Sequence, residues 1–236
     1  MRNLAGPAIT LAGVNLSLGQ GAARVHILKD VGLHISTGEA VGLVGPSGSG
    51  KSTLLMVMAG LERPDSGTVL VAGEMLPKLD EDALARFRGR NVGIVFQSFH
   101  LIPTMTALEN VAVPLELARI DDAAERALAE LAAVGLAERL DHYPAQLSGG
   151  EQQRVALARA FVVDPPIVMA DEPTGNLDST NGKVVLDLLL KRNREQSTTL
   201  ILVTHDPEVA SRADRRIVLK DGMVIEDELQ NGSHHG

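Results

Sequence analysis

The stretch Ala40-Val41-Gly42-Leu43-Val44-Gly45-Pro46-Ser47-Gly48-Ser49-Gly50-Lys51-Ser52-Thr53 joins a short apolar run to a turn rich in glycine and serine. Residues Gly45–Ser52 fit the phosphate-loop pattern G-x-x-x-x-G-K-[ST]. The run Ala40–Val44 is expected to be a strand, and Thr53–Leu61 has helical length and apolar character. Because this order of strand, glycine turn and helix is the context that the pattern requires, we expect an α/β fold with an anion-binding loop.

The residue types in this loop suit the binding of a nucleotide phosphate. Glycines allow backbone conformations in which successive N–H groups point at an anion, and the following helix adds a partial positive charge. The Lys51 ammonium is suited to the β- and γ-phosphates, and the Ser52 hydroxyl is suited to Mg²⁺. A plain glycine and serine turn before a helix is the alternative, but the flanking elements favour a nucleotide site that includes Gly45, Pro46, Ser47, Gly48, Ser49, Gly50, Lys51, Ser52 and Thr53.

Strand and helix patterns alternate on both sides of this loop. Short apolar strands are predicted at Thr68–Val71, Val92–Phe96, Ile167–Ala170 and Thr198–Val203. This alternation implies a mainly parallel sheet that helices cover on both faces. Before the loop, residues 8–35 mix short alternating apolar runs with glycine and asparagine, which predicts an N-terminal antiparallel β region of strands joined by turns.

Residues from about 98 to 163 differ in composition from the rest of the chain: they are rich in alanine, leucine, glutamate and arginine with helical spacing. Strand patterns resume after this segment, so we interpret it as a helical subdomain inserted in one domain that covers residues 1–236. Near the end of the chain, Asp221-Gly222 lies between two apolar runs and predicts a hairpin.

The composition excludes several classes of protein. Hydrophobic residues make up 44% and charged residues 22%, which is typical of a globular protein rather than a disordered one. The longest apolar run is Leu54–Leu61, too short for a membrane span. A net charge of −8 and 2% aromatic residues argue against a nucleic-acid partner. Because cysteine and a secretory start are both absent, we expect a cytoplasmic protein.

Two acids follow a second apolar strand. Ile167–Ala170 leads directly into Asp171 and Glu172, which places both carboxylates at the carboxyl edge of the sheet, where α/β folds bind ligands. One carboxylate there can hold Mg²⁺ through water, and the other can orient or deprotonate an attacking water. Acids are also common where a strand meets solvent, but the phosphate loop favours the functional interpretation.

The segment Leu147-Ser148-Gly149-Gly150-Glu151-Gln152-Gln153-Arg154 adds a third motif. Ser148 and Glu151 can form a capping box at the start of a helix, but a capping box does not require two glycines. Together with the phosphate loop and Asp171-Glu172, this string resembles the signature motif of the ATP-binding-cassette (ABC) ATPases. The resemblance extends over essentially the whole chain and its combination of motifs is specific.

The resemblance implies roles for further residues. Gln97 resembles the glutamine that senses Mg²⁺ and the γ-phosphate, and Asp171 resembles the Mg²⁺-binding aspartate of the family. Glu172 resembles the catalytic glutamate, and His205 resembles the switch histidine that contacts the γ-phosphate. The segment Gly175–Asp178 resembles the loop that crosses a dimer interface. The implied ligands are ATP and Mg²⁺, with the metal held by Ser52, Gln97 and Asp171.

The resemblance also implies a homodimer. In this family Ser148, Gly149 and Gly150 of one subunit close over the ATP that the other subunit's phosphate loop holds, and helix-start N–H groups with a hydroxyl form a reasonable anion clamp. One position departs from the pattern. Leu18 stands where many relatives have an aromatic residue that stacks on adenine, so we predict apolar contact with the base and weak discrimination between ATP and GTP.

The segments Phe96–Thr104 and Thr106–Val111 are most similar to the lipoprotein-releasing and macrolide-export group, including its YbbA-type branch. This similarity implies an ATPase peripheral to the cytoplasmic face of the inner membrane, paired with a separate integral-membrane permease that exports or extracts hydrophobic or lipidated cargo. An ATPase module without transport, in a cell-division or signalling complex, is the alternative. The apolar segment Phe99–Met105 either docks the permease or packs internally.

Overall fold

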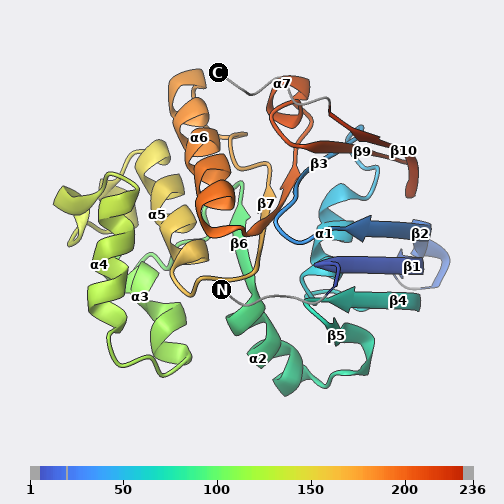
Figure 1. Ribbon diagram of the computed structural model, residues 1–236, viewed down its shortest axis with the longest axis horizontal. Coiled ribbons are helices and arrows are strands. Elements are labelled where there is room, and N and C mark those ends of the chain that lie inside the picture. Colours follow the sequence, from blue (N-terminus) through green and yellow to red (C-terminus); the bar gives the residue numbers. More distant parts are fainter. Residues whose placement is uncertain (1–5, 20, 231–236) are drawn as a thin grey trace.

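The computed structural model describes residues 6–19 and 21–230, which form two sheets with one helix between them and further helices outside (Figure 1). The larger sheet has the strand order β10-β9-β3-β8-β7-β6, and its pairs are parallel except for the antiparallel pair β9–β10. Its strands are β3 Ala40–Val44, β6 Val92–Phe96, β7 Ile167–Asp171, β8 Thr199–Val203, β9 Arg215–Lys220 and β10 Met223–Leu229.

The smaller sheet is antiparallel and comes from the first part of the chain. Its order is β2-β1-β4-β5, and its strands are β1 Ile9–Leu18, β2 Val25–Ile35, β4 Ser66–Val71 and β5 Glu74–Met75. The helices are α1 Lys51–Met58, α2 Glu81–Asn91, α3 Ala107–Leu117, α4 Ala123–Ala133, α5 Gly149–Phe161, α6 Ser179–Gln196 and α7 Pro207–Ala210. The predicted mainly parallel sheet and the N-terminal antiparallel β region are both confirmed.

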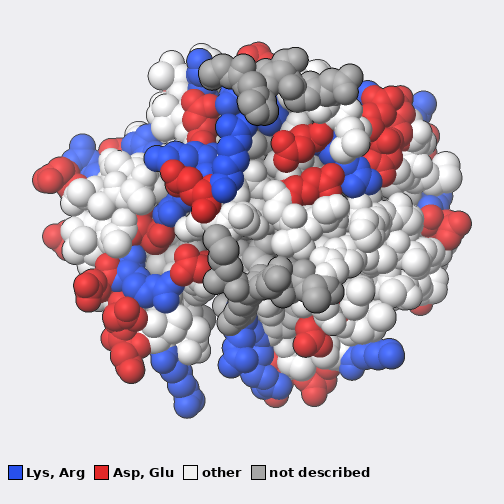
Figure 2. Space-filling view, viewed as in Figure 1, with Lys and Arg blue, Asp and Glu red and all other residues white. Residues whose placement is uncertain are grey.

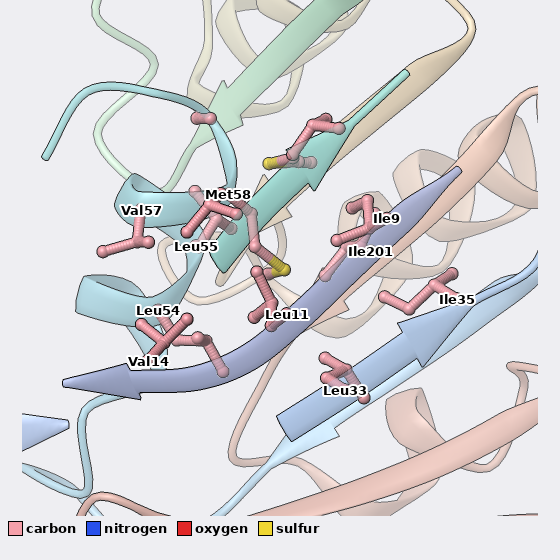
Figure 3. Close-up of a cluster of buried hydrophobic side chains, with 14 of the residues drawn as sticks. Ile9, Leu11, Val14, Leu33, Ile35, Leu54, Leu55, Val57, Met58 and Ile201 are labelled. Atoms are coloured by element: carbon pink, nitrogen blue, oxygen red, sulfur yellow. The ribbon is translucent and has the colours of Figure 1, made fainter. Parts of the chain in front are cut away.

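Helix α1 lies between the two sheets and fills the first hydrophobic core. Leu54, Leu55 and Met58 are fully buried and face Leu11 and Val14 of β1 (Figure 3). Full burial of a leucine or methionine side chain contributes about 1.5–3 kcal/mol. This packing fixes the start of α1, and with it the loop that precedes the helix.

A second core lies on the other face of the larger sheet, under α5 and α6. Because successive strand residues point to opposite faces, Met169 and Ile201 belong to the α1 core while Ala170 and Leu202 belong to this second one. Helices α3, α4 and α5 pack against one another, and α5 also contacts β6 and α6. Through α5, the helical segment is therefore attached directly to the sheet.

Several predicted elements have limits that differ from the structure by one to three residues: β4 begins at Ser66 instead of Thr68, β7 ends at Asp171 instead of Ala170, and β8 begins at Thr199 instead of Thr198. The strands at Ala40–Val44 and Val92–Phe96 have the predicted limits, while α1 begins at Lys51 instead of Thr53 and ends at Met58 instead of Leu61. The helix stops early because Gly60 has a left-handed φ of 68°. The early start matters more, because it places Lys51 in the first turn of the helix.

Figure 2 shows charged side chains of both signs around the rim of one face, with acidic residues over β9 and β10. Two of these acids, Glu226 and Glu228, both accept hydrogen bonds from Arg216, at 2.9 and 3.2 Å. In the part of the chain that the structure describes, no helix combines the length and the apolar character needed to cross a membrane.

Candidate functional site

The loop between β3 and α1 wraps tightly and depends on two glycines. Gly45 has a φ of 151°, and any side chain there would collide with the carbonyl oxygen of Leu219. Gly50 caps α1 in the left-handed conformation with a φ of 101°. A β-carbon on Gly50 would lie only 3.2 Å from the Ile27 carbonyl oxygen. The loop is thus held against β2 and β9, in a conformation that L-residues disfavour.

The Lys51 side chain folds back over this loop. Its Nζ donates to the carbonyl oxygens of Gly45 at 2.8 Å and Pro46 at 3.0 Å, and the residue is only 8% exposed. Both partners are neutral, so the ammonium charge is held inside the loop by carbonyl groups without being neutralised by them. A positive charge in this state suits an incoming anion.

Ser52 and Asp171 join the loop to the end of β7. The Ser52 hydroxyl donates to Asp171 Oδ1 at 3.1 Å. Burial raises the pKa of the Asp171 carboxyl, and the neighbouring charge of Glu172 also raises it, against the Ser52 hydrogen bond and the charge of Lys51, which lower it. A hydroxyl and a carboxylate in contact are ligands that Mg²⁺ prefers.

Glu172 and His205 meet at the ends of neighbouring strands. Strands β7 and β8 pair in register with Asp171 opposite Val203, so the residues that follow them lie side by side. His205 Nδ1 donates to Glu172 Oε1 at 2.8 Å, and the Glu172 backbone N–H donates to the Val203 carbonyl at 2.9 Å. Glu172 has a left-handed φ of 47°, a strained conformation for a residue other than glycine, of the kind that gathers at functional sites.

Gln97, at the end of β6, is tied to the loop after β7. Its side-chain Nε2 donates to Asn176 Oδ1 at 3.2 Å, and Asn176 Nδ2 donates to the backbone carbonyl of Gln97 at 3.0 Å. A β-carbon on Gly175 would lie 2.7 Å from Gln97 Nε2, so a larger residue there would displace the Gln97 amide from this position. Sequence reasoning named Gln97 and Asn176 separately and did not predict their mutual bonds.

Ser148, Gly149 and Gly150 form the start of α5, away from the loop before α1. The predicted capping box is present, with the Glu151 N–H donating to Ser148 Oγ at 3.3 Å. Within the described ranges, no hydrogen bond joins residues 148–150 to residues 45–53. Figure 1 shows β6 and β7 between α5 and α1. One chain therefore does not bring the signature motif onto its own phosphate loop.

Leu18 lies at the end of β1 and pairs with Val25 of β2. Both side chains are exposed, at 39% and 57%, although both are apolar. Two residues further along β2, Ile27 touches the phosphate loop beside Gly50. The Leu18–Val25 pair thus offers an apolar surface next to the loop, with no aromatic ring.

Two residues of α5 whose role was not predicted from the sequence hold the segments that follow β6 and β7 in place. The buried Gln153 amide donates to the carbonyls of Pro173 at 2.7 Å and Phe96 at 3.3 Å. Arg159 donates to the carbonyls of His100 at 2.7 Å and Phe99 at 3.0 Å, and burial lowers the pKa of its guanidinium. Nothing local in the sequence signals these bonds, because their partners are backbone carbonyls of distant loops.

The described residues contain no cluster of three or more histidines, aspartates and glutamates that could bind a metal without other help.

Comparisons with known proteins agree on one family. The profile described as "ABC transporter" matches residues 28–175. The chain is 54% identical over 213 residues to the ABC transporter ATP-binding protein YbbA of Escherichia coli K12, covering 89% of this chain and 93% of that protein. It is 47% identical over 227 residues to the lipoprotein-releasing system ATP-binding protein LolD of Bordetella pertussis, covering 95% and 98%.

A solved structure has the same fold. The dimeric, post-hydrolysis form of the ATP-binding cassette MJ0796, bound to ADP and Pi, matches with a TM-score of 0.89 at 43% identity. The match covers 95% of this chain and 99% of that one.

Proposed function

This chain belongs to the ABC transporter family, and from that premise we propose that it energises the export or extraction of hydrophobic or lipidated cargo through a separate membrane permease. As an ABC ATPase it binds and hydrolyses ATP. The observation that carries the proposal is the pairing of Glu172 with His205 beside Asp171, Ser52 and the phosphate loop, in a chain that is similar to YbbA and LolD over most of its length.

In this proposal Glu172 is the general base of ATP hydrolysis. Its carboxylate takes a proton from water, the water oxygen bonds to the γ-phosphorus, and the bond from that phosphorus to the β–γ bridging oxygen breaks. The hydrogen bond from His205 at 2.8 Å orients the carboxylate. His205 is 71% exposed at its side chain, so its ring can turn to the γ-phosphate as well. Lys51 exchanges its carbonyl partners for phosphate oxygens.

Mg²⁺ fits the groups at the end of β7. Ser52 and Asp171 supply oxygen ligands that already touch each other. The bond to Asn176 Oδ1 uses the Gln97 side-chain nitrogen Nε2 and leaves the side-chain oxygen Oε1, the atom that suits a hard cation, for the metal. When bound, Mg²⁺ neutralises charge that develops on the phosphate oxygens. In the loop itself, Ser49 Oγ is buried without a hydrogen-bond partner among the described residues, and a phosphate oxygen would satisfy it.

The active unit in this proposal is a homodimer with two ATP molecules between its subunits. Ser148, Gly149 and Gly150 form the capped start of α5, and within the described residues no hydrogen bond joins them to their own phosphate loop. A twofold arrangement brings them to the partner's loop and closes without forming a filament. The similarity to a dimeric cassette bound to ADP and Pi supports this arrangement.

We assign the permease contact to the segment after Gln97, at the edge of a helical subdomain that spans about residues 98–163. The structure divides the apolar segment Phe99–Met105 into two kinds of residue. Leu101 packs against the second core, whereas Ile102 is 36% exposed. Ile102, not Leu101, is therefore the apolar side chain offered to a partner on the cytoplasmic face of the inner membrane.

An affinity pull-down tests the function. Glu172→Gln protein with Mg-ATP is mixed with detergent-solubilised native membranes, and bound proteins are identified by mass spectrometry. We expect a permease with few spans and a large periplasmic part. A many-span permease with a binding protein would mean import, and soluble or cell-division partners alone would favour the non-transport function.

Two matched substitutions sharpen this test. Ile102→Asp should abolish recovery of the permease, whereas Leu117→Asp should not, because Leu117 is 80% exposed at the far end of α3. Equal recovery with both variants would refute the docking assignment.

A further inference from the structure

The hydroxyl of Ser148 is engaged by a carboxylate. Ser148 Oγ and the Ser148 backbone N–H both donate to Glu151 Oε2, each at 2.8 Å. A serine hydroxyl has one proton to donate. While that proton is directed at Glu151, the hydroxyl cannot donate it to a phosphate oxygen.

The other oxygen of this carboxylate meets an arginine. Arg139, at the end of the 3₁₀ turn Ala137–Arg139, donates from Nε to Glu151 Oε1 at 3.0 Å. The two side chains are 44% and 20% exposed, so water screens this pair in part. The hydrogen bonds from Ser148, with a smaller contribution from Arg139, lower the pKa of Glu151 to about 2. The carboxylate is therefore ionised at neutral pH.

The helix start does not need this charge. A capping box works equally well with glutamine at the third position, because a neutral amide oxygen also accepts the Ser148 N–H. A carboxylate beside a hydroxyl that contacts ATP places negative charge next to a triphosphate, and like charges repel. The Glu151 carboxylate repels the triphosphate less when a cation, here Arg139, is paired with it.

We propose that Glu151 and Arg139 are positioning residues that set the strength of the ATP-dependent dimer with opposite signs. Glu151 opposes the triphosphate held by the partner subunit, and Arg139 offsets that charge from the side of the helical subdomain. This inference rests on the proposed function, in which Ser148 clamps ATP in trans.

Opposite effects of two substitutions test the proposal. In the Glu172→Gln background with saturating Mg-ATP, analytical ultracentrifugation measures the dimer dissociation constant. Glu151→Gln should tighten each clamp about fivefold, or ~1 kcal/mol, and hence tighten the two-clamp dimer about 25-fold. Arg139→Ala should weaken the dimer by a similar factor. Arg139→Lys should restore most of the loss.

Three controls distinguish an effect of charge on the dimer from an effect of altered structure. The double variant Arg139→Ala/Glu151→Gln should resemble Glu151→Gln, because Arg139 then has no carboxylate to offset. Arg126→Ala breaks another ion pair of the same helical segment, with Asp164 at 2.7 Å, and should leave the dimer unchanged. High salt should reduce the effects of both charge variants.

The outcomes separate the two proposals. If the parent protein forms no ATP-dependent dimer, the trans clamp of the proposed function is wrong and the roles of Arg139 and Glu151 are wrong with it. If the parent dimerises but Glu151→Gln and Arg139→Ala both weaken the dimer, or both leave it unchanged, only the present inference is overturned. Thermal unfolding of each variant shows that folding is intact.

Discussion

Replacing Asn110 by alanine should loosen the segment that follows Gln97 without touching the ATP site. Asn110 is fully buried on α3. Its Oδ1 accepts from the Ile102 N–H at 2.7 Å. Its Nδ2 donates to the carbonyls of Ile102, Met105 and Thr106, at 3.1, 3.0 and 2.9 Å. One side chain therefore closes the loop between β6 and α3.

The cost of Asn110→Ala follows from these bonds. The amide has two protons for three acceptors, so roughly three hydrogen bonds at about 1 kcal/mol each are at stake. Because residues 102–104 are exposed, water can replace part of what is lost. We expect the free energy of unfolding to fall by about 2 kcal/mol.

Urea unfolding measures this loss, and hydrogen exchange locates it. The midpoint should fall with an unchanged slope, and amides in residues 98–106 should exchange faster. Asn91→Ala is the matched control, because the half-buried Asn91 donates only one bond, to the Phe87 carbonyl at 3.0 Å. A loss for Asn110→Ala below about 0.5 kcal/mol, or one equal to that of the control, would show that the Asn110 hydrogen bonds do not hold this loop.

Three further predictions concern the nucleotide site. Leu18→Tyr should tighten ATP binding about two- to tenfold through stacking, while the parent should discriminate ATP from GTP by less than about tenfold in competition binding. Asp171→Asn should abolish Mg²⁺-dependent ATPase yet raise the melting temperature of the nucleotide-free protein at neutral pH. The pKa of Asp171 is raised in the folded protein, so its ionised carboxylate destabilises the fold at pH values above that pKa. The rise in melting temperature that Asp171→Asn produces should therefore shrink as the pH falls through the folded-state pKa. Calorimetry at several pH values checks this. Gly45→Ala should abolish ATP binding because its β-carbon meets the Leu219 carbonyl. Gly48→Ala meets no nearby atom, so only its left-handed φ of 76° should cost stability, about 1 kcal/mol in calorimetry.

Most elements of the fold could be predicted from local sequence patterns. The phosphate loop, the apolar strands and the capping box each depend on residues within a few positions of one another, and the structure has all three. The family assignment is confirmed as well, because its motifs are short and specific. Helix α6 was not predicted as an element, since Ser179–Gln196 mixes apolar pairs with charges and is recognisable mainly by the Asp178 cap.

The connections between motifs could not be predicted in the same way. The bonds between Gln97 and Asn176 depend on the pairing of β6 with β7, and the bonds from Arg159 to the carbonyls of Phe99 and His100 depend on the packing of α5 against β6. Those contacts join residues about 60 to 80 positions apart. Every residue has a backbone carbonyl, so the residue type does not indicate which carbonyl accepts a side-chain hydrogen bond. For the same reason, the inward packing of Leu101 and the exposure of Ile102 could not be predicted from residue types alone.

ATP hydrolysis in this mechanism depends on Glu172, which removes the proton from the attacking water. The most direct test is the rate of phosphate release by Glu172→Gln under saturating Mg-ATP, compared with the parent protein in the same assay. Because a general base contributes about 10²- to 10⁴-fold, we expect a loss of at least about 100-fold with ATP binding retained. A variant that keeps more than about a tenth of the parent rate would contradict it.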